Sequence, residues 1–368
     1  MEAMLPAFSV TFGNASSIHA FGREAREILE RARGTIAGCV GAEPAEIFFT
    51  SGGTEADNLA LRGAVSAAKT RDAIVTSSTE HHAVLEPCRH LAGEGKSLVI
   101  LPVDESGVVD LEALRRSVGG RTALVSIMHA NNETGTIAPL PAIAAIAHEA
   151  GALVHTDAVQ SAGRIPVDVG ELGADLMTFS AHKMYGPKGI GALYVKRGVP
   201  VEPILLGGGQ ERGRRPGTEN VPLAVGFAEA FRIALLDREE ESRRLRSLRD
   251  RLEERLRDRF HGVIVNGHPA ERLPHILNVS FGSGDYTLEG DMLVAGMDLE
   301  GVAVTSGSAC TSGSLEPSHV IRAMGRDEKT AQATLRFSFG RGNTMDDVGE
   351  VCARLEAVIS RMVRKTSG

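Results

Sequence analysis

The feature that most constrains the fold is a regular alternation of short apolar runs with helix-like stretches between residues 47 and 195. Strands that are nearly all apolar are typical of a sheet covered by helices on both faces. The alternation with helices therefore predicts an α/β fold with a mostly parallel, seven-stranded sheet. The predicted strands are Ile47–Thr50, Ala73–Ser77, Ser97–Leu101, Thr122–Ile127, Leu153–Asp157, Leu176–Ser180 and Ala192–Val195, with helices expected at Thr54–Ala68, His82–Leu91 and Leu140–Ala150.

A second, smaller domain is expected towards the C-terminus, because 368 residues exceed what one small core needs. The stretch Glu239–Arg259 is crowded with Arg and Glu of nearly cancelling charge, which favours a solvated amphipathic helix over a nucleic-acid patch. Its apolar stripe is formed by Leu245, Leu248, Leu252 and Leu256. We expect residues 12–238 to form a large domain, and residues 239–368, together with 1–11, a small α+β domain.

Composition excludes several classes of function. A net charge of −7 and an aromatic content of 4% without Trp argue against direct binding of nucleic acid or an anionic membrane. No apolar run approaches the roughly 20 residues of a membrane-spanning helix, and no secretory signal is visible. The four cysteines are scattered, without CxxC or metal-ligand spacing, so we expect a reduced cytoplasmic protein with no resident metal. They are Cys39, Cys88, Cys310 and Cys352.

The segment Ser180–Gly189 directly follows a predicted strand and ends in a Gly/Pro turn. Ligands of α/β proteins usually bind at such strand ends. Lys183 is suited to form a Schiff base there, while Ser180 and His182 are placed to reach a phosphate. Taken alone, the segment is equally compatible with a surface lysine in a turn.

Two further segments follow strands in the same way. Thr50–Asn58 places small residues before a helix, where backbone N–H groups bind anions; Thr54 is alternatively a simple helix cap. In His155–Gln160, Asp157 and Gln160 are spaced to bind a pyridine nitrogen and a ring hydroxyl, respectively. An aspartate in such a position is otherwise a common turn or capping residue.

His81 and Asn132 lie in two more segments at strand ends, Thr79–Val84 and His129–Gly135. His81 is suited to stack on a ring or to carry protons, although a lone histidine is more often structural. Cys310 differs from the other cysteines because it lies among small polar residues in Thr305–Leu315, where an accessible thiol can act as a nucleophile. The other three cysteines lie in apolar helical patterns that indicate burial.

These segments together resemble the NifS/IscS-like cysteine desulfurases of the class V, fold type I pyridoxal phosphate (PLP) enzymes. Residues 179–195 are similar to the Schiff-base signature of that family, and the serine-rich stretch around Cys310 is similar to its long cysteine loop. The resemblance runs from about Phe12 to Val351. One departure is that the chain begins at a segment resembling the helix after the family's N-terminal Ala-Thr-Thr-Pro loop.

The resemblance implies roles for individual residues. Lys183 would be the PLP lysine, Cys310 the persulfide cysteine and His81 the stacking histidine. Asp157 would pair with the pyridinium and Gln160 with the ring oxygen. The phosphate would be bound by Gly53, Thr54, Ser180 and His182, together with Thr218 from the second subunit of a homodimer. Asn132 and Arg336 would bind the substrate carboxylate.

The implied reaction converts L-cysteine to L-alanine and leaves a persulfide on Cys310. The sulfur then passes to an acceptor protein for iron–sulfur cluster assembly or tRNA thiolation, with at most a transient contact between Cys310 and a cluster. Two alternatives stay open. One is a small-amino-acid transaminase of the same class, which would not need Cys310; the other is a weakly active sulfur-relay partner, supported only by the N-terminal departure.

Overall fold

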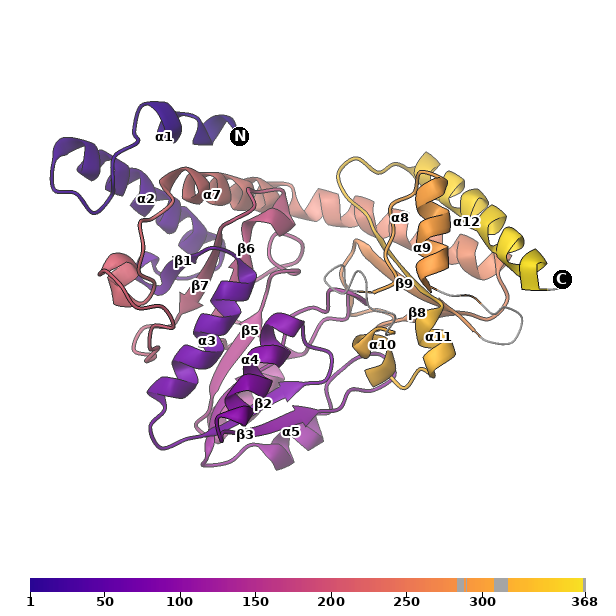
Figure 1. The fold of residues 1–368 in the computed structure, drawn as a ribbon, viewed down its shortest axis with the longest axis horizontal. Coiled ribbons are helices and arrows are strands. Elements are labelled where there is room, and N and C mark those ends of the chain that lie inside the picture. The colour runs from indigo at the N-terminus through magenta and orange to yellow at the C-terminus, as the bar shows by residue number, and fades with distance from the viewer. Residues whose placement is uncertain (283–287, 289, 308–316, 367–368) are drawn as a thin grey trace. The chain divides into compact units, whose positions relative to one another are not determined.

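A computed structural model describes residues 1–282, 288, 290–307 and 317–366 (Figure 1). The chain forms two compact units. Unit 1 comprises Met1–Leu101, Leu111–His129 and Ala138–Arg238, and unit 2 comprises Pro102–Asp110, Ala130–Ile137 and Glu239–Gly368.

The N-terminal residues differ from the expected division into domains. Residues 1–11 belong to unit 1 rather than to the smaller unit. Ala7, in the short helix α1 (Pro6–Ser9), is buried in a core cluster of unit 1. Met4 packs so closely on Gly226 that a Cβ there would lie 2.5 Å from the Met4 sulfur. Apolar contact with helix α7 (Val221–Leu236) therefore decides the placement of the N-terminus.

The seven-stranded sheet of unit 1 has the order β1-β7-β6-β5-β4-β2-β3. The five strands from β6 to β3 are parallel, whereas β7 lies antiparallel between β1 and β6. Five of the predicted strands have the expected bounds, and β4 and β7 differ by one residue at one end. The strands are β1 (Ile47–Thr50), β2 (Ala73–Ser77), β3 (Ser97–Leu101), β4 (Thr122–Ser126), β5 (Leu153–Asp157), β6 (Leu176–Ser180) and β7 (Gly191–Val195).

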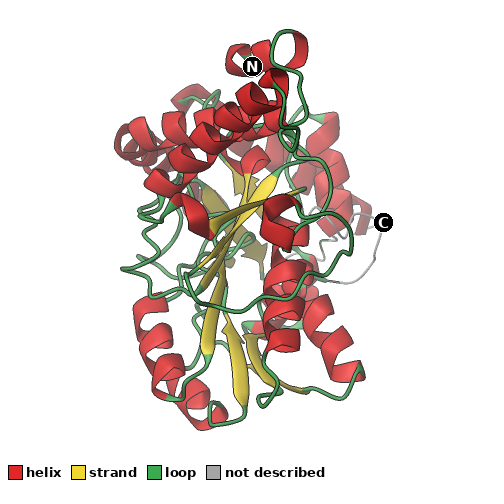
Figure 2. Ribbon diagram, turned by 90° about the vertical axis from the view of Figure 1, so that its left-hand side faces the viewer, coloured by secondary structure: helices red, strands yellow, loops and turns green. Residues whose placement is uncertain are grey.

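Helices lie on both sides of this sheet, as Figure 2 shows. Neighbouring residues of one strand belong to different cores: Phe49 packs in the cluster that contains α2 (Ala20–Cys39) and α7, whereas Phe48 packs in the cluster that contains α3 (Gly53–Ala67) and α4 (His82–Gly93). This two-sided burial explains why the strands are apolar at nearly every position. The other helical elements of unit 1 are η1 (Glu2–Met4), η2 (Pro44–Glu46), α5 (Leu111–Ser117), α6 (Leu140–Glu149), η3 (Ala181–Met184) and η4 (Gln210–Gly213).

Unit 2 is built on an antiparallel sheet in the order β10-β9-β8. The expected leucine stripe of α8 is confirmed, since all four leucines are buried in the core of this unit. The elements are α8 (Arg238–Arg259), β8 (Val263–Asn266), β9 (Ile276–Phe281), α9 (Gly290–Leu299), α10 (His319–Ala323), α11 (Glu328–Gln332), β10 (Thr334–Ser338) and α12 (Met345–Thr366).

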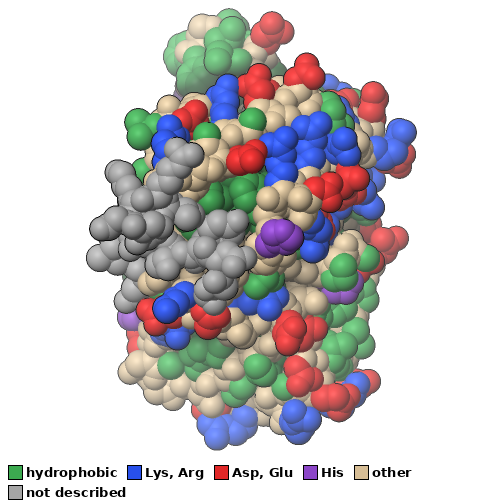
Figure 3. All heavy atoms as spheres, turned by 90° about the vertical axis from the view of Figure 1, so that its right-hand side faces the viewer, with side chains coloured by type: hydrophobic (Ala, Val, Ile, Leu, Met, Phe, Trp, Pro, Cys, Tyr) green, Lys and Arg blue, Asp and Glu red, His purple; other side chains and the backbone are tan. Residues whose placement is uncertain are grey.

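The charges of α8 are largely paired with one another along the helix. Arg244 bonds Glu241 three residues earlier, and Arg257 bonds Glu253 four residues earlier. Figure 3 shows Lys and Arg side chains interspersed with Asp and Glu side chains on the face that it views. Among the described residues, no helix combines the length and apolar character that crossing a membrane requires.

Candidate active site

Lys183 lies in η3, the tight turn that follows β6. Tyr185 closes this turn in the left-handed conformation, with φ 63°. Gly186 packs against the start of the turn, where a Cβ would lie 2.8 Å from the carbonyl oxygen of Ala181. The side chain of Lys183 is exposed and therefore accessible to a small molecule.

The start of α3 lies against the end of β6. A Cβ on Gly53 would lie 3.0 Å from the Cγ2 of Val159 and 3.7 Å from the Cβ of Ser180. The first turn of α3 follows Gly52, and no side chain among the described residues caps it, so Thr54 is not the cap. Ser180 Oγ and His182 Nδ1 are 2.9 Å apart. Uncapped helix N–H groups beside a hydroxyl and an imidazole are suited to bind a phosphate.

Asp157 ends β5 and is buried. Its Oδ1 accepts a hydrogen bond of 2.8 Å from the backbone N–H of Val159. Burial raises the pKa of Asp157 to about 6, although this N–H and the nearby Lys183 oppose the shift. The carboxyl group is therefore mostly ionised at neutral pH in a site that disfavours charge, and a cationic partner would stabilise it.

A buried polar network lies next to Asp157, and the sequence analysis did not identify it. His155 is two residues earlier in β5 and shares the same face of the sheet. Its Nδ1 is 2.8 Å from Ser126 Oγ, its Nε2 is 3.1 Å from Thr178 Oγ1, and Nε2 is 3.6 Å from Asp57 Oδ1. Burial lowers the pKa of His155 to about 3, so the imidazole is neutral.

Two further carboxyl groups are buried in the same unit. Burial first, and Asp157 second, raise the pKa of Asp57 well above its ordinary value. Burial raises the pKa of Glu80 to about 8, although Glu80 Oε1 accepts hydrogen bonds from Ser77 Oγ and Met128 N. Glu80 therefore keeps its proton at neutral pH, and burial favours the protonated form of Asp57 as well.

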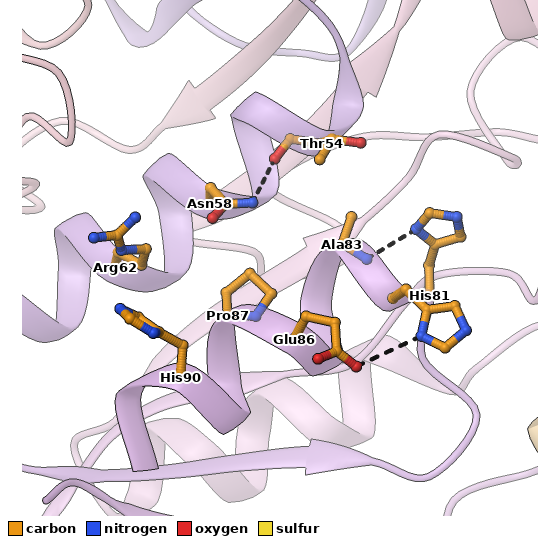
Figure 4. A pocket seen from close by; sticks show the side chains of 9 residues that line it. Thr54, Asn58, Arg62, His81, Ala83, Glu86, Pro87 and His90 are labelled. Atoms are coloured by element: carbon orange, nitrogen blue, oxygen red, sulfur yellow. Dashed lines mark hydrogen bonds and ion pairs between the residues drawn. The ribbon is translucent and has the colours of Figure 1, made fainter. Parts of the chain in front are cut away.

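His81 caps α4 through its Nδ1, which accepts a hydrogen bond of 3.1 Å from the N–H of Ala83. It also lines a pocket of about 490 Å³ between α3 and α4 (Figure 4). Thr54 lines the same pocket, whereas Arg62 and His90 lie at its other end. The pocket thus brings together two of the predicted cofactor residues, and the cap fixes the orientation of the imidazole.

Gln160 and Thr218 occupy less buried positions in unit 1. Gln160 is half-buried in the turn after β5, three residues from Asp157. Thr218 is exposed in the segment that leads into α7. Arg215 attaches that segment to the start of α3, because its Nε lies 2.8 Å from Glu55 Oε1.

The two predicted carboxylate-binding residues come together within unit 2. Arg336 of β10 donates from Nη1 to the backbone carbonyl of Asn132 over 2.9 Å. Both residues are half-buried. The segment that carries Asn132 is fixed to the same unit through Gly135, whose carbonyl accepts from Leu273 N.

Cys310 lies outside the described residues, but both flanks of its segment are described. Before it, Thr305 pairs with Arg336 through backbone hydrogen bonds, one of them 2.7 Å long. After it, Ser318 Oγ donates to Glu133, the neighbour of Asn132. The chain therefore leaves and re-enters the described structure beside the predicted carboxylate-binding residues.

The other cysteines agree with the expected burial in part. Cys88 and Cys352 are buried in helices, and Cys39, at the end of α2, is partly exposed. Burial raises the pKa of the Cys39 thiol to about 11 and that of Cys88 to about 12, and it also raises the pKa of Cys352. These three thiols are poor nucleophiles.

The residues of unit 1 fit PLP as a group. The glycine at the start of α3 leaves little room for a side chain, the helix N–H groups lack a side-chain cap, and a buried carboxylate lies near an exposed lysine. These features match a phosphate, a protonated ring nitrogen and an aldehyde, respectively. No cluster of three metal-ligating side chains occurs in the part of the chain that the structure describes.

Comparisons with known proteins show to which family the chain belongs. The family model described as aminotransferase class-V matches residues 1–351. Similar relatives include a cysteine desulfurase IscS of Dictyoglomus turgidum, 46% identical over 98% of this chain and 91% of the relative, and a cysteine desulfurase of Gluconacetobacter diazotrophicus, 48% identical over 98% and 90%. A solved NifS-like protein superposes with a TM-score of 0.90 at 38% identity, covering 98% of this chain and 95% of that one. The chain therefore belongs to the cysteine desulfurases of the class-V aminotransferase family.

Proposed function

We propose that this cysteine desulfurase uses PLP bound in unit 1 and takes the sulfur of L-cysteine onto Cys310. The observation that most supports the assignment is the anchoring of the Cys310 segment beside Arg336 and Asn132. A transaminase would need the carboxylate-binding pair but not a cysteine segment next to it.

The cofactor would be held by residues whose placement is described above. The N–H groups at the start of α3, with Thr54, Ser180 and His182, would bind its phosphate. Asp157 would pair with the ring nitrogen, Gln160 with the ring oxygen, and His81 would stack on the ring. When bound, PLP supplies an electron sink for the substrate's α-carbon.

The residues of this chain would then divide the work on L-cysteine. Arg336 and Asn132 would bind the substrate carboxylate, because a guanidinium can pair both oxygens. Lys183 Nζ would take the α-proton. The Cys310 thiolate would attack the substrate sulfur, so that an S–S bond forms while the C–S bond breaks and its electron pair stays with the carbon skeleton, which leaves as alanine.

The persulfide on Cys310 would pass its terminal sulfur to an acceptor protein in the cytoplasm, in iron–sulfur cluster assembly or tRNA thiolation. We further propose that the chain acts as a homodimer in which Thr218 of each subunit reaches the phosphate bound by the other.

Persulfide mapping tests the assignment of Cys310 directly. After brief treatment with L-cysteine, mass spectrometry of alkylated peptides should find the added sulfur on Cys310 and on none of Cys39, Cys88 and Cys352. Cys310→Ala should still bind PLP and L-cysteine, because neither step uses the thiol, but it should lose alanine formation.

Cys39→Ala is the matched control, since Cys39 is the most accessible of the other thiols, and it should keep normal turnover. Persulfide on another cysteine, or normal turnover by Cys310→Ala, would contradict the proposal. Formation of a keto acid from small amino acids without sulfide release would favour the transaminase instead.

A further inference from the structure

The segment before α7 contains backbone strain that the proposed chemistry does not explain. Glu211 and Arg212 both adopt left-handed conformations, with φ 46° and 57°. Only a few per cent of residues other than glycine adopt a positive φ, because the Cβ then crowds the backbone. Two such residues in succession persist only where the surrounding structure enforces them, and such strain often marks functional segments.

A buried ion pair enforces this conformation. Both carboxylate oxygens of Glu211 lie 2.8 Å from guanidinium nitrogens of Arg33. The side chains of these two residues are 2% and 4% exposed, so water does not weaken the pair. Glu211 also accepts a hydrogen bond of 2.9 Å from Phe49 N, and Arg33 donates to the carbonyl of Ile47. Glu211 is thus bonded to helix α2 and strand β1 at once.

Further contacts extend the anchor along the segment. The guanidinium groups of Arg212 and Arg214 lie 5.1 Å and 4.6 Å from the centre of the Phe48 ring. Arg215 forms its ion pair with Glu55, and Gln210 Oε1 accepts from the N–H of Gly217 over 3.1 Å. The segment is therefore held at successive residues up to Gly217.

Thr218, which follows these anchors, lies at the surface. Thr218 is exposed, whereas Asn220 accepts from Leu223 N and so caps α7. Anchors on both sides of Thr218 restrain the backbone around it and leave its side chain at the surface. An exposed side chain on a restrained backbone is suited to reach a second copy of the chain rather than its own core.

We propose that Glu211 is a positioning residue, which holds Thr218 in the conformation that completes the cofactor phosphate site of a second copy of this chain. The inference rests on the proposed function, in which Thr218 contacts the partner's phosphate. Without the Glu211 carboxylate, Glu211 and Arg212 lose what holds them at positive φ. The segment then relaxes, and Thr218 moves away from the position that the second subunit needs.

The first test measures the affinity of the apo homodimer for PLP. Glu211→Ala should weaken PLP binding on the order of ten- to a hundredfold, the range expected when a bound phosphate loses one hydrogen bond. Glu211→Gln should restore part of the affinity, because its amide oxygen still accepts from Phe49 N and Arg33. The matched control is Glu253→Ala, which removes the nearer of two acidic partners of the buried Arg272 in unit 2. It should lower thermal stability to a similar degree and leave PLP affinity unchanged.

A mixed dimer distinguishes action on the second subunit from action within the same chain. Differently tagged Lys183→Ala and Glu211→Ala chains form a dimer in which the intact Lys183 receives its Thr218 from the chain with the intact Glu211. PLP trapped by borohydride on the Glu211→Ala chain should return to the wild-type affinity. If it stays as weak as in the Glu211→Ala homodimer, or if the wild-type protein binds PLP fully as a monomer, the inference is wrong.

Because both readouts are PLP binding, they are independent of sulfur transfer. If the protein lacked desulfurase turnover but showed the mixed-dimer rescue, the proposed function would be wrong and the inference about Glu211 would stand. If it showed normal desulfurase turnover without the rescue, the inference would be wrong and the desulfurase function would stand.

Discussion

The two units differ in how deeply they bury their candidate charged groups. In unit 1, Asp157, Asp57 and Glu80 are buried together, and burial raises the pKa of each carboxyl group. In unit 2, Arg336 is only half-buried, and one of its nitrogens is held by a backbone carbonyl. Unit 1 thus sets the proton affinity of fixed groups, whereas unit 2 keeps this arginine partly exposed.

The difference in burial predicts which substitutions should alter stability and which should alter ligand binding. A buried carboxylate costs stability until a cationic partner arrives, so changes to it alter both stability and cofactor binding. A half-buried arginine can pair both oxygens of a carboxylate, so on the proposed function changes to it should mainly alter substrate binding. Substitutions in the two units should therefore differ in kind as well as in size.

The largest effect is expected from Lys183→Ala in unit 1. On the proposed function, the substitution would remove both the covalent attachment of PLP and the base that takes the α-proton, and a general base alone contributes about 10²- to 10⁴-fold. Alanine formation should fall by at least that factor, and the visible absorbance of the covalently bound cofactor should disappear.

Lys188→Ala serves as the control, since Lys188 is an exposed lysine five residues away. It should keep both the absorbance and the turnover. A borohydride-reducible linkage to PLP in Lys183→Ala would show that another lysine binds the cofactor.

A smaller effect of a different kind is expected from Arg336→Lys in unit 2. Lysine keeps the charge but cannot pair both carboxylate oxygens, which costs about 2–3 kcal/mol, or on the order of a hundredfold in kcat/KM. The loss should appear mainly as a raised KM for L-cysteine, with unchanged PLP affinity. Steady-state kinetics and PLP titration measure the two quantities separately, and a loss confined to kcat would remove Arg336 from substrate binding.

The smallest effect concerns the stability of the apoprotein and depends on pH. The pKa of folded Asp157, about 6, lies above its ordinary value of 3.8, so between these values the folded state keeps a proton that the unfolded state has lost. Stability therefore falls as pH rises through this window. Asp157→Asn should raise the free energy of unfolding by at most about 3 kcal/mol at pH 8, the free-energy equivalent of the difference between the two pKa values, and change it little at pH 4. Denaturant titrations of the apoprotein at the two pH values measure this.

Asp175→Asn provides a contrast of opposite sign within the same unit. Asp175 is also buried, but it bonds His148 over 2.8 Å, Lys196 over 3.4 Å and the N–H of Val154. Its replacement should destabilise the protein at pH 8. If Asp157→Asn destabilised the apoprotein equally, the carboxylate of Asp157 would be stabilised in the folded state, contrary to the comparison.

Much of the fold and part of the site could be predicted from the sequence. Alternating apolar runs located all seven strands, and the segments after the strands singled out Lys183 and Asp157 as candidate site residues, which remain predictions. The network of His155, Asp57 and their hydroxyl partners was missed, because each of these residues is an ordinary polar residue until α3 packs on β5 and β6. The only signal was that two of them lie in segments already singled out.

The sequence by itself determined the two-sided sheet and the leucine stripe of α8, because the local spacing of apolar residues determines which face of a strand or helix is buried. Tertiary structure alone decided that β7 lies antiparallel between β1 and β6, and that the N-terminal residues pack on α7. It also decided the charge of the buried acids and the strained backbone at Glu211. These depend on groups brought together from distant parts of the chain, and neither their contacts nor their exclusion from water is recorded in local spacing.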